Sequence, residues 1–499
     1  MEMPVDRCRR CSRNCMPYLM AFGLAAFLPG GAWADRVPDA NGVRPPLIDA
    51  VKNGNESLVR ALLQKKVDVN AADADGSTAL HWAAHWDDLK IADLLIRAGA
   101  KANAAADLGV TPLWLASENG NSAMVARLLA AGANPDAALL SGETPVMVAA
   151  RSGYPAVVEQ LLAKGANANA HGTRGQTALM WTVSQKHPEV VKVLLAHHAD
   201  LQLRSDVWTE VMAVPPHGYL PYNKAIPHGG ETALMFAARV DDLASAKLLV
   251  AAGANVNDAD AWGVSATTLA AHSGFRELVE FLLEQGADPN LAPNGFTALH
   301  EAIMRRDEEM VKVLLDHRAD PNTPLQTWTP TRRSSADFHF EPSLVGATPF
   351  WLATRFLEPN VMRLLAEHGA DPRFVLHASW VAAQGTGRQE RTATTTALLA
   401  AMGLTGDNSN RESGGAAAWV SPPRSQREAL ALETVKVALE LGVDVNATTK
   451  EGATALDGAR NLKYDTVVKY LLDKGAKPGT GATPAPGRGR PQQNVTEPR

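Results

Sequence analysis

A short motif recurs every 33 residues along most of this chain, and this repetition constrains the fold more than any other feature. Each copy begins with Thr, followed by Pro or Ala and then an apolar residue, as at Thr78, Thr111, Thr144 and Thr177. A second motif, two leucines followed after a short gap by Gly-Ala, keeps the same phase. Self-similarity at such a period predicts one elongated repeat array, in which each unit is stabilised by its neighbours.

The unit beginning at Thr111 shows how one repeat is built. Thr is a good helix N-cap and Pro112 fits the first helical position, so a short helix is predicted to start there. Gly120 ends it, because glycine readily takes the left-handed conformation that closes helices. A second helix with apolar residues at helical spacing follows and stops at Gly132. Two such helices cannot bury their apolar faces alone, so neighbouring units must stack.

These motifs resemble the ankyrin repeat family. The resemblance covers about residues 43–478, with eleven units beginning near Pro45, Thr78, Thr111, Thr144, Thr177, Thr232, Ser265, Thr297, Thr348, Thr396 and Thr454. It implies an all-α fold, a solenoid of paired short helices with β-hairpin-like turns. It also implies that His81 and His300, at the fourth place of the motif, are structural hydrogen-bonding residues between units. Trp114, Met147, Met180, Met235 and Trp351 occupy the same place and are expected to pack as core.

Three insertions interrupt the period, near residues 203–229, 323–345 and 403–426. The first two carry aromatic and basic side chains and fall at the turns between units. The third is rich in Gly, Ser and Asn and separates a helix around Leu398 to Met402 from one around Thr434 to Leu441. Insertions in repeat proteins map to loops, often at the binding face, so they are either contact lobes or tolerated loop expansions.

The N-terminal 34 residues have the order of a signal peptide: several arginines, an uncharged apolar run over residues 16–28, then small residues up to Ala34. We expect cleavage after Ala34 and export to the periplasm or the medium; the alternative is a membrane anchor formed by residues 16–29. Residues 35–42 are then a short linker, and residues 479–499 a Pro/Gly-rich tail expected to be disordered. Cys8, Cys11 and Cys15 all lie in the removed segment.

Charge and motifs exclude several functions. The net charge is −5, and removal of residues 1–34 makes it −7, which argues against nucleic-acid binding. The chain has no phosphate-binding loop, zinc-protease or nucleophile-elbow motif, so we predict no enzyme activity, no metal and no cofactor. The alternative hypothesis is an enzyme, or a ligand- or metal-binding protein, with a site built from the insertions. Its candidate groups are His217, Tyr219, Tyr222, His228 and His339.

The family resemblance further implies a protein partner, bound by a monomer through the concave face and the hairpin tips. Carried over unit by unit, the ends of the first helices contribute His85, Trp86, Glu118, Arg151, Arg239, His272, Met304, Arg305, Arg355 and Phe356. The tips contribute Arg174, Trp262 and Phe296, with Asp75, Leu108, Leu140 and Lys450 at the equivalent places of other units. Trp, Phe and Arg are enriched at binding hot spots. The sequence thus predicts an exported scaffold for protein–protein interaction.

Overall fold

The computed structural model describes residues 45–212, 224–329, 340–384, 387–405 and 424–481. Within these ranges the helices form eleven consecutive pairs, and the predicted all-α solenoid is confirmed. The pairs are α1 (Pro46–Lys52) and α2 (Glu56–Gln64), α3 (Ala79–His85) and α4 (Leu89–Arg97), α5 (Pro112–Asn119) and α6 (Ser122–Ala130), α7 (Pro145–Arg151) and α8 (Pro155–Ala163), α9 (Ala178–Ser184) and α10 (Pro188–Ala196), α11 (Ala233–Val240) and α12 (Leu243–Ala251), α13 (Ala266–Ser273) and α14 (Arg276–Glu284), α15 (Ala298–Arg305) and α16 (Glu308–Asp316), α17 (Pro349–Arg355) and α18 (Pro359–Glu367), α19 (Ala397–Ala401) and α21 (Arg424–Glu440), and α22 (Ala455–Leu462) and α23 (Asp465–Asp473).

Helix boundaries follow from the motif residues. The Thr111 hydroxyl accepts a hydrogen bond from the Trp114 N–H (3.2 Å), and Pro112 occupies the first helical position of α5. Gly120 ends the helix with φ 75°, the left-handed conformation expected there. Asn121 then caps α6. Each repeat therefore carries its own start and stop signals, which explains why the period in the sequence places the helices correctly.

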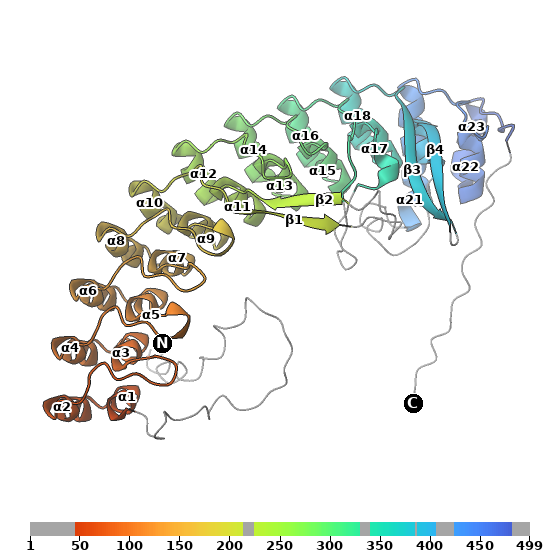
Figure 1. Ribbon diagram of the computed structural model, residues 1–499. Helices are drawn as coiled ribbons and strands as arrows, with labels where there is room; N and C mark the ends of the chain where they lie inside the picture. Colours follow the sequence, from red (N-terminus) through yellow and green to blue (C-terminus); the bar gives the residue numbers. More distant parts are fainter. Residues whose placement is uncertain (1–44, 213–223, 330–339, 385–386, 406–423, 482–499) are drawn as a thin grey trace, which may run out of the picture.

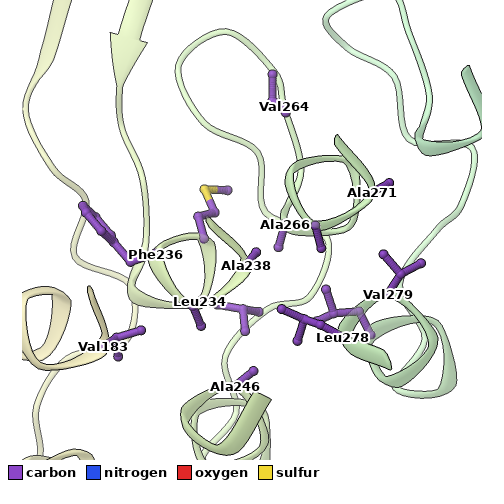
Figure 2. Packing of buried hydrophobic residues seen from close by; sticks show 14 of the residues in the cluster. Val183, Leu234, Phe236, Ala238, Ala246, Val264, Ala266, Ala271, Leu278 and Val279 are labelled. Carbon is purple, nitrogen blue, oxygen red and sulfur yellow. The ribbon is translucent and has the colours of Figure 1, made fainter. Parts of the chain in front are cut away.

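The pairs stack along a curved path (Figure 1), with α1, α3, α5 and the other first helices inside the curve and α2, α4, α6 and the other second helices outside it. Buried apolar side chains form a single cluster that runs from Leu47 to Ala476. Figure 2 shows one part of it, where Leu234 of α11, Ala246 of α12 and Leu278 of α14 meet. The core is thus shared between neighbouring repeats along the whole array, as expected for a solenoid.

Two sets of hydrogen bonds connect successive repeats. On one side, an asparagine after several of the second helices bonds to the next repeat: the Asn103 amide donates to the Gly132 carbonyl (2.8 Å), and Asn70, Asn257, Asn290, Asn322 and Asn446 make the equivalent bond. On the other side, the turns between repeats, called tips here, bond backbone to backbone. The Leu140 N–H donates to the Leu108 carbonyl (2.8 Å), and the Asp206 N–H to the Arg174 carbonyl (2.8 Å).

The first insertion forms an antiparallel hairpin on the inner side of the curve, made of β1 (Val207–Met212) and β2 (Lys224–Gly229) (Figure 1). The second insertion is described up to residue 329 and again from residue 340. The Thr329 N–H donates to the Phe340 carbonyl (3.0 Å), the Phe340 N–H donates to the Thr329 hydroxyl (2.8 Å), and the 3-10 helix η5 (Pro342–Leu344) follows. Most of the third insertion lies outside the described residues. The helix after it, α21, begins at Arg424, ten residues before the predicted start at Thr434.

A fourth insertion was not predicted. The strands β3 (Val375–Gln384) and β4 (Gly387–Thr396) pair antiparallel just before α19 as a second hairpin. Its buried side chains alternate with exposed ones: Leu376, Ala378 and Trp380 point into the core, and His377 and Ser379 point to solvent. This alternation is the ordinary sign of a half-buried strand, and the helical period of the repeats does not report it.

The C-terminal end of the array also differs from the prediction. Residues 479–481, expected to belong to a disordered tail, pack against the last repeat: the Gly479 N–H donates to the Asp457 carboxylate (2.8 Å) and the Thr480 N–H to the Gly452 carbonyl (3.1 Å). The second of these bonds resembles the bonds between tips, so the chain covers the last tip. Among the described residues no helix is both long and apolar enough to cross a membrane.

Candidate protein-interaction surface

Of the two motif histidines, His81 makes the predicted bond between repeats, whereas His300 bonds within its own repeat. The His81 Nδ1 accepts the Thr78 N–H (3.0 Å), and its Nε2 lies 3.0 Å from the Val110 carbonyl of the next repeat. In the repeat of α15, the His300 Nδ1 accepts the Thr297 N–H (3.1 Å), and burial lowers the pKa of His300 to about 4. Trp114, Met147, Met180, Met235 and Trp351, at the same place, are buried. The fourth place of the motif is therefore interior and is no part of a binding surface.

At the N-terminal end of the inner side, aromatic side chains meet solvent at the end of α3. Trp86 is 41% exposed, and its ring lies 4.6 Å from that of His85, centroid to centroid. Burial lowers the pKa of His85, so its ring is uncharged at neutral pH. Trp82 lies on the same helix, and the ammonium group of Lys52 is 4.1 Å from the centroid of its ring. Both predicted residues of this repeat are accessible.

The next repeats place two carboxylates and one guanidinium on the inner side. Arg151 of α7 forms an ion pair with Glu143 (2.7 Å) and lies over the Trp181 ring of α9, 5.4 Å from its centroid. Glu118 of α5 is half-buried, and its Oε1 has no hydrogen-bond donor among the described residues. Burial raises the pKa of both Glu118 and Glu143, and Arg151 partly offsets this. Two carboxylates thus share one cation.

Arg174 forms the tip of the fifth repeat, within the 3-10 helix η3 (Thr173–Gly175), and is exposed. Its guanidinium lies 5.0 Å from the Trp208 ring centroid. The ring of His228 also stacks on Trp208, with the two ring centroids 5.6 Å apart. His228 was a candidate for a ligand site, and here it is 3.8 Å from Glu210 of the facing strand. The β1–β2 hairpin therefore continues the row of tips.

Two residues predicted at the binding surface are interior, and these predictions were wrong. Phe296 is 4% exposed because Phe340, supplied by the second insertion, packs against it with ring centroids 5.3 Å apart. Met304 is 3% exposed because it lies on α15 where that helix packs between α13 and α17, and its side chain belongs to the core. Trp262 is half-buried against Phe296, 5.8 Å away. The insertions have covered these tips.

The remaining predicted residues of the C-terminal half lie at the inner helix ends and bind to neighbouring groups of the chain. Arg239 is exposed and forms an ion pair with Glu231. His272 Nδ1 lies 3.0 Å from the buried carboxylate of Glu301, and Arg305 donates to the His272 carbonyl (2.8 Å). Arg355 and Phe356 are half-buried, with the guanidinium 6.0 Å from the ring centroid. These side chains are engaged within the array.

Exposed apolar side chains show where the surface is open. The described residues include nine large apolar side chains that are exposed, and seven of them lie on the tips, on the hairpins or at an inner helix end: Trp86, Leu108, Leu140, Val207, Trp208, Val211 and Val375. Leu140 is 81% exposed and Leu108 52% exposed. The hairpin residues were missed as surface candidates, although Trp208 was a signal, because a strand inside the insertion was not expected.

No group of three or more His, Cys, Asp or Glu side chains that could hold a metal ion occurs in the part of the chain that the structure describes. Of the residues considered for a site in the insertions, His217, Tyr219, Tyr222 and His339 lie outside the described residues.

Comparison with known proteins agrees with this architecture. A family model described as ankyrin repeats (3 copies) matches residues 11–106, 47–138, 113–205, 234–325 and 292–375, which together make up more than half of the chain.

Curated relatives match over shorter stretches. The regulatory protein NPR6 of Arabidopsis thaliana is 42% identical over 102 residues, 18% of this chain and 20% of its own. The BTB/POZ domain and ankyrin repeat-containing protein COCH of Pisum sativum is 38% identical over 137 residues, 25% of each chain. The putative ankyrin repeat protein L92 of Acanthamoeba polyphaga mimivirus is 44% identical over 70 residues, 14% of this chain and 17% of its own. The chain spans a quarter or less of the length of these relatives, and it belongs to the ankyrin repeat family.

Proposed function

We propose that this protein is an exported scaffold that binds a protein partner as a monomer, through the concave face and the hairpin tips of its first five repeats. The family supports this proposal, because ankyrin repeats imply a scaffold for protein–protein interaction and are generally non-enzymatic. Within this surface the contact residues are His85, Trp86, Glu118, Arg151 and Arg174, together with the exposed leucines Leu108 and Leu140.

The observation that carries this proposal is the difference between the two halves of the array. In the N-terminal half the tips expose Leu108 and Leu140, and the adjoining hairpin exposes Trp208. In the C-terminal half the insertions bury Phe296, and Phe340 packs against it. Exposed apolar side chains that gather on one face of a soluble protein mark an interaction site, whereas scattered ones need no explanation. The open half is therefore the better binding surface.

A cross-linking experiment tests the binding face. We expect a photoreactive amino acid at position 140 to form a covalent adduct with the native partner in an extract of the source cells, because Leu140 protrudes from the tip row. The same group at position 58, an exposed leucine on the outer helix α2, serves as the matched control and is expected to form none. Trp86→Ala should weaken recovery of the adduct by about tenfold or more, the usual effect of losing a tryptophan anchor. An adduct from position 58 alone would place the binding face on the convex side.

Export is proposed on the residue order at the N-terminus. Several arginines, an apolar run and small residues ending at Ala34 favour cleavage by a signal peptidase, with release to the periplasm or the medium. N-terminal sequencing of the protein recovered outside the cytoplasm is expected to begin at Asp35. The alternative, a protein anchored by residues 16–29, predicts an intact Met1 in the membrane fraction, and that result would rule out cleavage.

A further inference from the structure

The inner side of the array holds cations in a recurring arrangement. The Lys52 ammonium lies over the Trp82 ring (4.1 Å) and pairs with the Asp73 carboxylate (2.9 Å). Further along, Arg151 lies over the Trp181 ring (5.4 Å) and pairs with Glu143 (2.7 Å). In both places the basic side chain lies at the end of a first helix, the indole face comes from the first helix of the next repeat, and the carboxylate comes from a tip. The ring quadrupole and the carboxylate both attract the cation, so each arrangement is electrostatically complete.

Between these two places lie an indole, Trp86, and a carboxylate, Glu118, and no single basic side chain of the described residues is both over this ring and paired with this acid. Trp86, at the end of α3, is 41% exposed. Glu118, at the end of α5, belongs to the next repeat. The two helix ends are in contact, because the side-chain amide of Asn119 donates to the His85 carbonyl (2.8 Å). Trp86 and Glu118 therefore lie at adjoining helix ends on the inner side of the array.

The groups around Glu118 compensate its charge only in part. Its Oε1 is buried without a hydrogen-bond donor among the described residues, a costly state for a polar atom. Arg151 acts on Glu118 through space, but its ion pair is with Glu143. The pKa of His85 is lowered by burial, so that ring supplies no positive charge at neutral pH. When Glu118 and Glu143 are both ionised, the single positive charge of Arg151 leaves one negative charge in excess, and a cation of a bound partner would balance it.

We propose that the concave face of the second and third repeats takes a lysine or arginine side chain of the protein partner, seated against Trp86 and paired with Glu118. The partner therefore presents a segment with a basic residue to this face, and the apolar residues of that segment contact the exposed leucines of the tips. This inference rests on the proposed function and adds the chemical character of the partner to it. The lysine or arginine of the partner would also donate a hydrogen bond to Glu118 Oε1, which has no donor among the described residues.

A peptide selection tests this proposal with the full chain. Biotinylated protein is used to select binders from a random dodecapeptide phage library, and the selected peptides are synthesised. Peptides that bind this face are recognised because they bind the wild type and no longer bind Trp86→Ala. These peptides are expected to share one Lys or Arg. Replacing that residue by norleucine should weaken binding about tenfold, and Glu118→Gln in the protein should have the same effect. Glu280→Gln, which changes an exposed acid on the outer helix α14, is the matched control and should leave binding unchanged.

The two substitutions should not be additive if the side chains meet. The norleucine peptide is expected to bind wild type and Glu118→Gln equally, since the same pair is removed in either case. Peptides that depend on Trp86 but share no basic residue, or that bind Glu118→Gln as well as wild type, would overturn this inference and leave the proposed binding face in place. A library that yields no peptide dependent on Trp86 would instead count against the face itself, and the inference would fall with it. Circular dichroism of each variant establishes that the fold is retained.

Discussion

Replacing Phe340 by alanine is expected to reduce the free energy of unfolding by about 3–5 kcal/mol, the usual cost of removing a buried phenylalanine ring. Phe340 is 1% exposed, and its ring packs on those of Phe296 (5.3 Å) and His300 (6.2 Å). It comes from an insertion, yet it fills a space between elements of the regular array. Loss of the ring leaves a cavity beside the motif histidine of α15.

Hydrogen exchange followed by mass spectrometry would locate the effect. The Phe340→Ala variant should lose protection in α15 and in the tip around Phe296, and equilibrium denaturation would give the change in stability. Water entering the cavity should also raise the pKa of His300 from about 4 toward its ordinary value of 6.5, which an NMR titration would detect. Leu140→Ala, at an 81% exposed position, is the control and should change stability by less than about 0.5 kcal/mol. A similarly small effect of Phe340→Ala would show that the insertion contributes no core.

Replacing Glu358 by glutamine is expected to stabilise the protein at mildly alkaline pH. Glu358 lies at the N-terminal cap of α18, and burial raises its pKa from 4.5 to about 8, although Arg306 opposes this shift and Glu308 adds to it. In the unfolded chain the carboxyl ionises near its ordinary value, so folding takes up a proton throughout the intervening range. The free energy of unfolding therefore falls as pH rises, by at most about 1.4 kcal/mol per pH unit, or about 4 kcal/mol between pH 5 and pH 8.

Glutamine has nearly the same shape and no charge, so this pH dependence should disappear in Glu358→Gln. The measurement is chemical denaturation at several pH values between 5 and 9, comparing wild type with the variant. Glu309→Gln, at an exposed position of the neighbouring helix α16, is the control and should keep the wild-type slope. If Glu358→Gln also keeps that slope, then other acids with raised pKa, such as Glu118, Glu143 and Asp260, must produce it.

Much of the architecture could be read from local signals. Thr111, Pro112 and Gly120 fix the start and end of a helix through capping and backbone conformation, effects that act within a few residues. The burial of the fourth place of the motif was also predictable, because this place has the same position in each helix pair, and His81, Trp114, Met147 and Trp351 are all buried there. Such residues depend on their own repeat and its neighbour, and the sequence period reports both.

The exposure of individual surface positions could not be predicted in the same way. Phe296 occupies a tip, as Leu108 does, yet one is buried and the other exposed. The difference arises from Phe340, whose position relative to the tip depends on how the insertion folds back, and the period carries no information about that. The β3–β4 hairpin is a different case, because the alternation of Leu376, Ala378 and Trp380 with polar residues was available in the sequence.

The asparagine bonds between repeats have a consequence for how such a chain can change in length. Asn290 bonds to a carbonyl 28 residues ahead, whereas Asn322 makes the same bond to a carbonyl 47 residues ahead, across the second insertion. The stacking distance between neighbouring units is thus set by these contacts and by helix packing, independently of how much polypeptide connects the units at a tip. Loop closure costs little for each added residue, so the tips are natural places for grafting foreign segments, such as epitopes or second binding modules, while the scaffold on either side keeps its register.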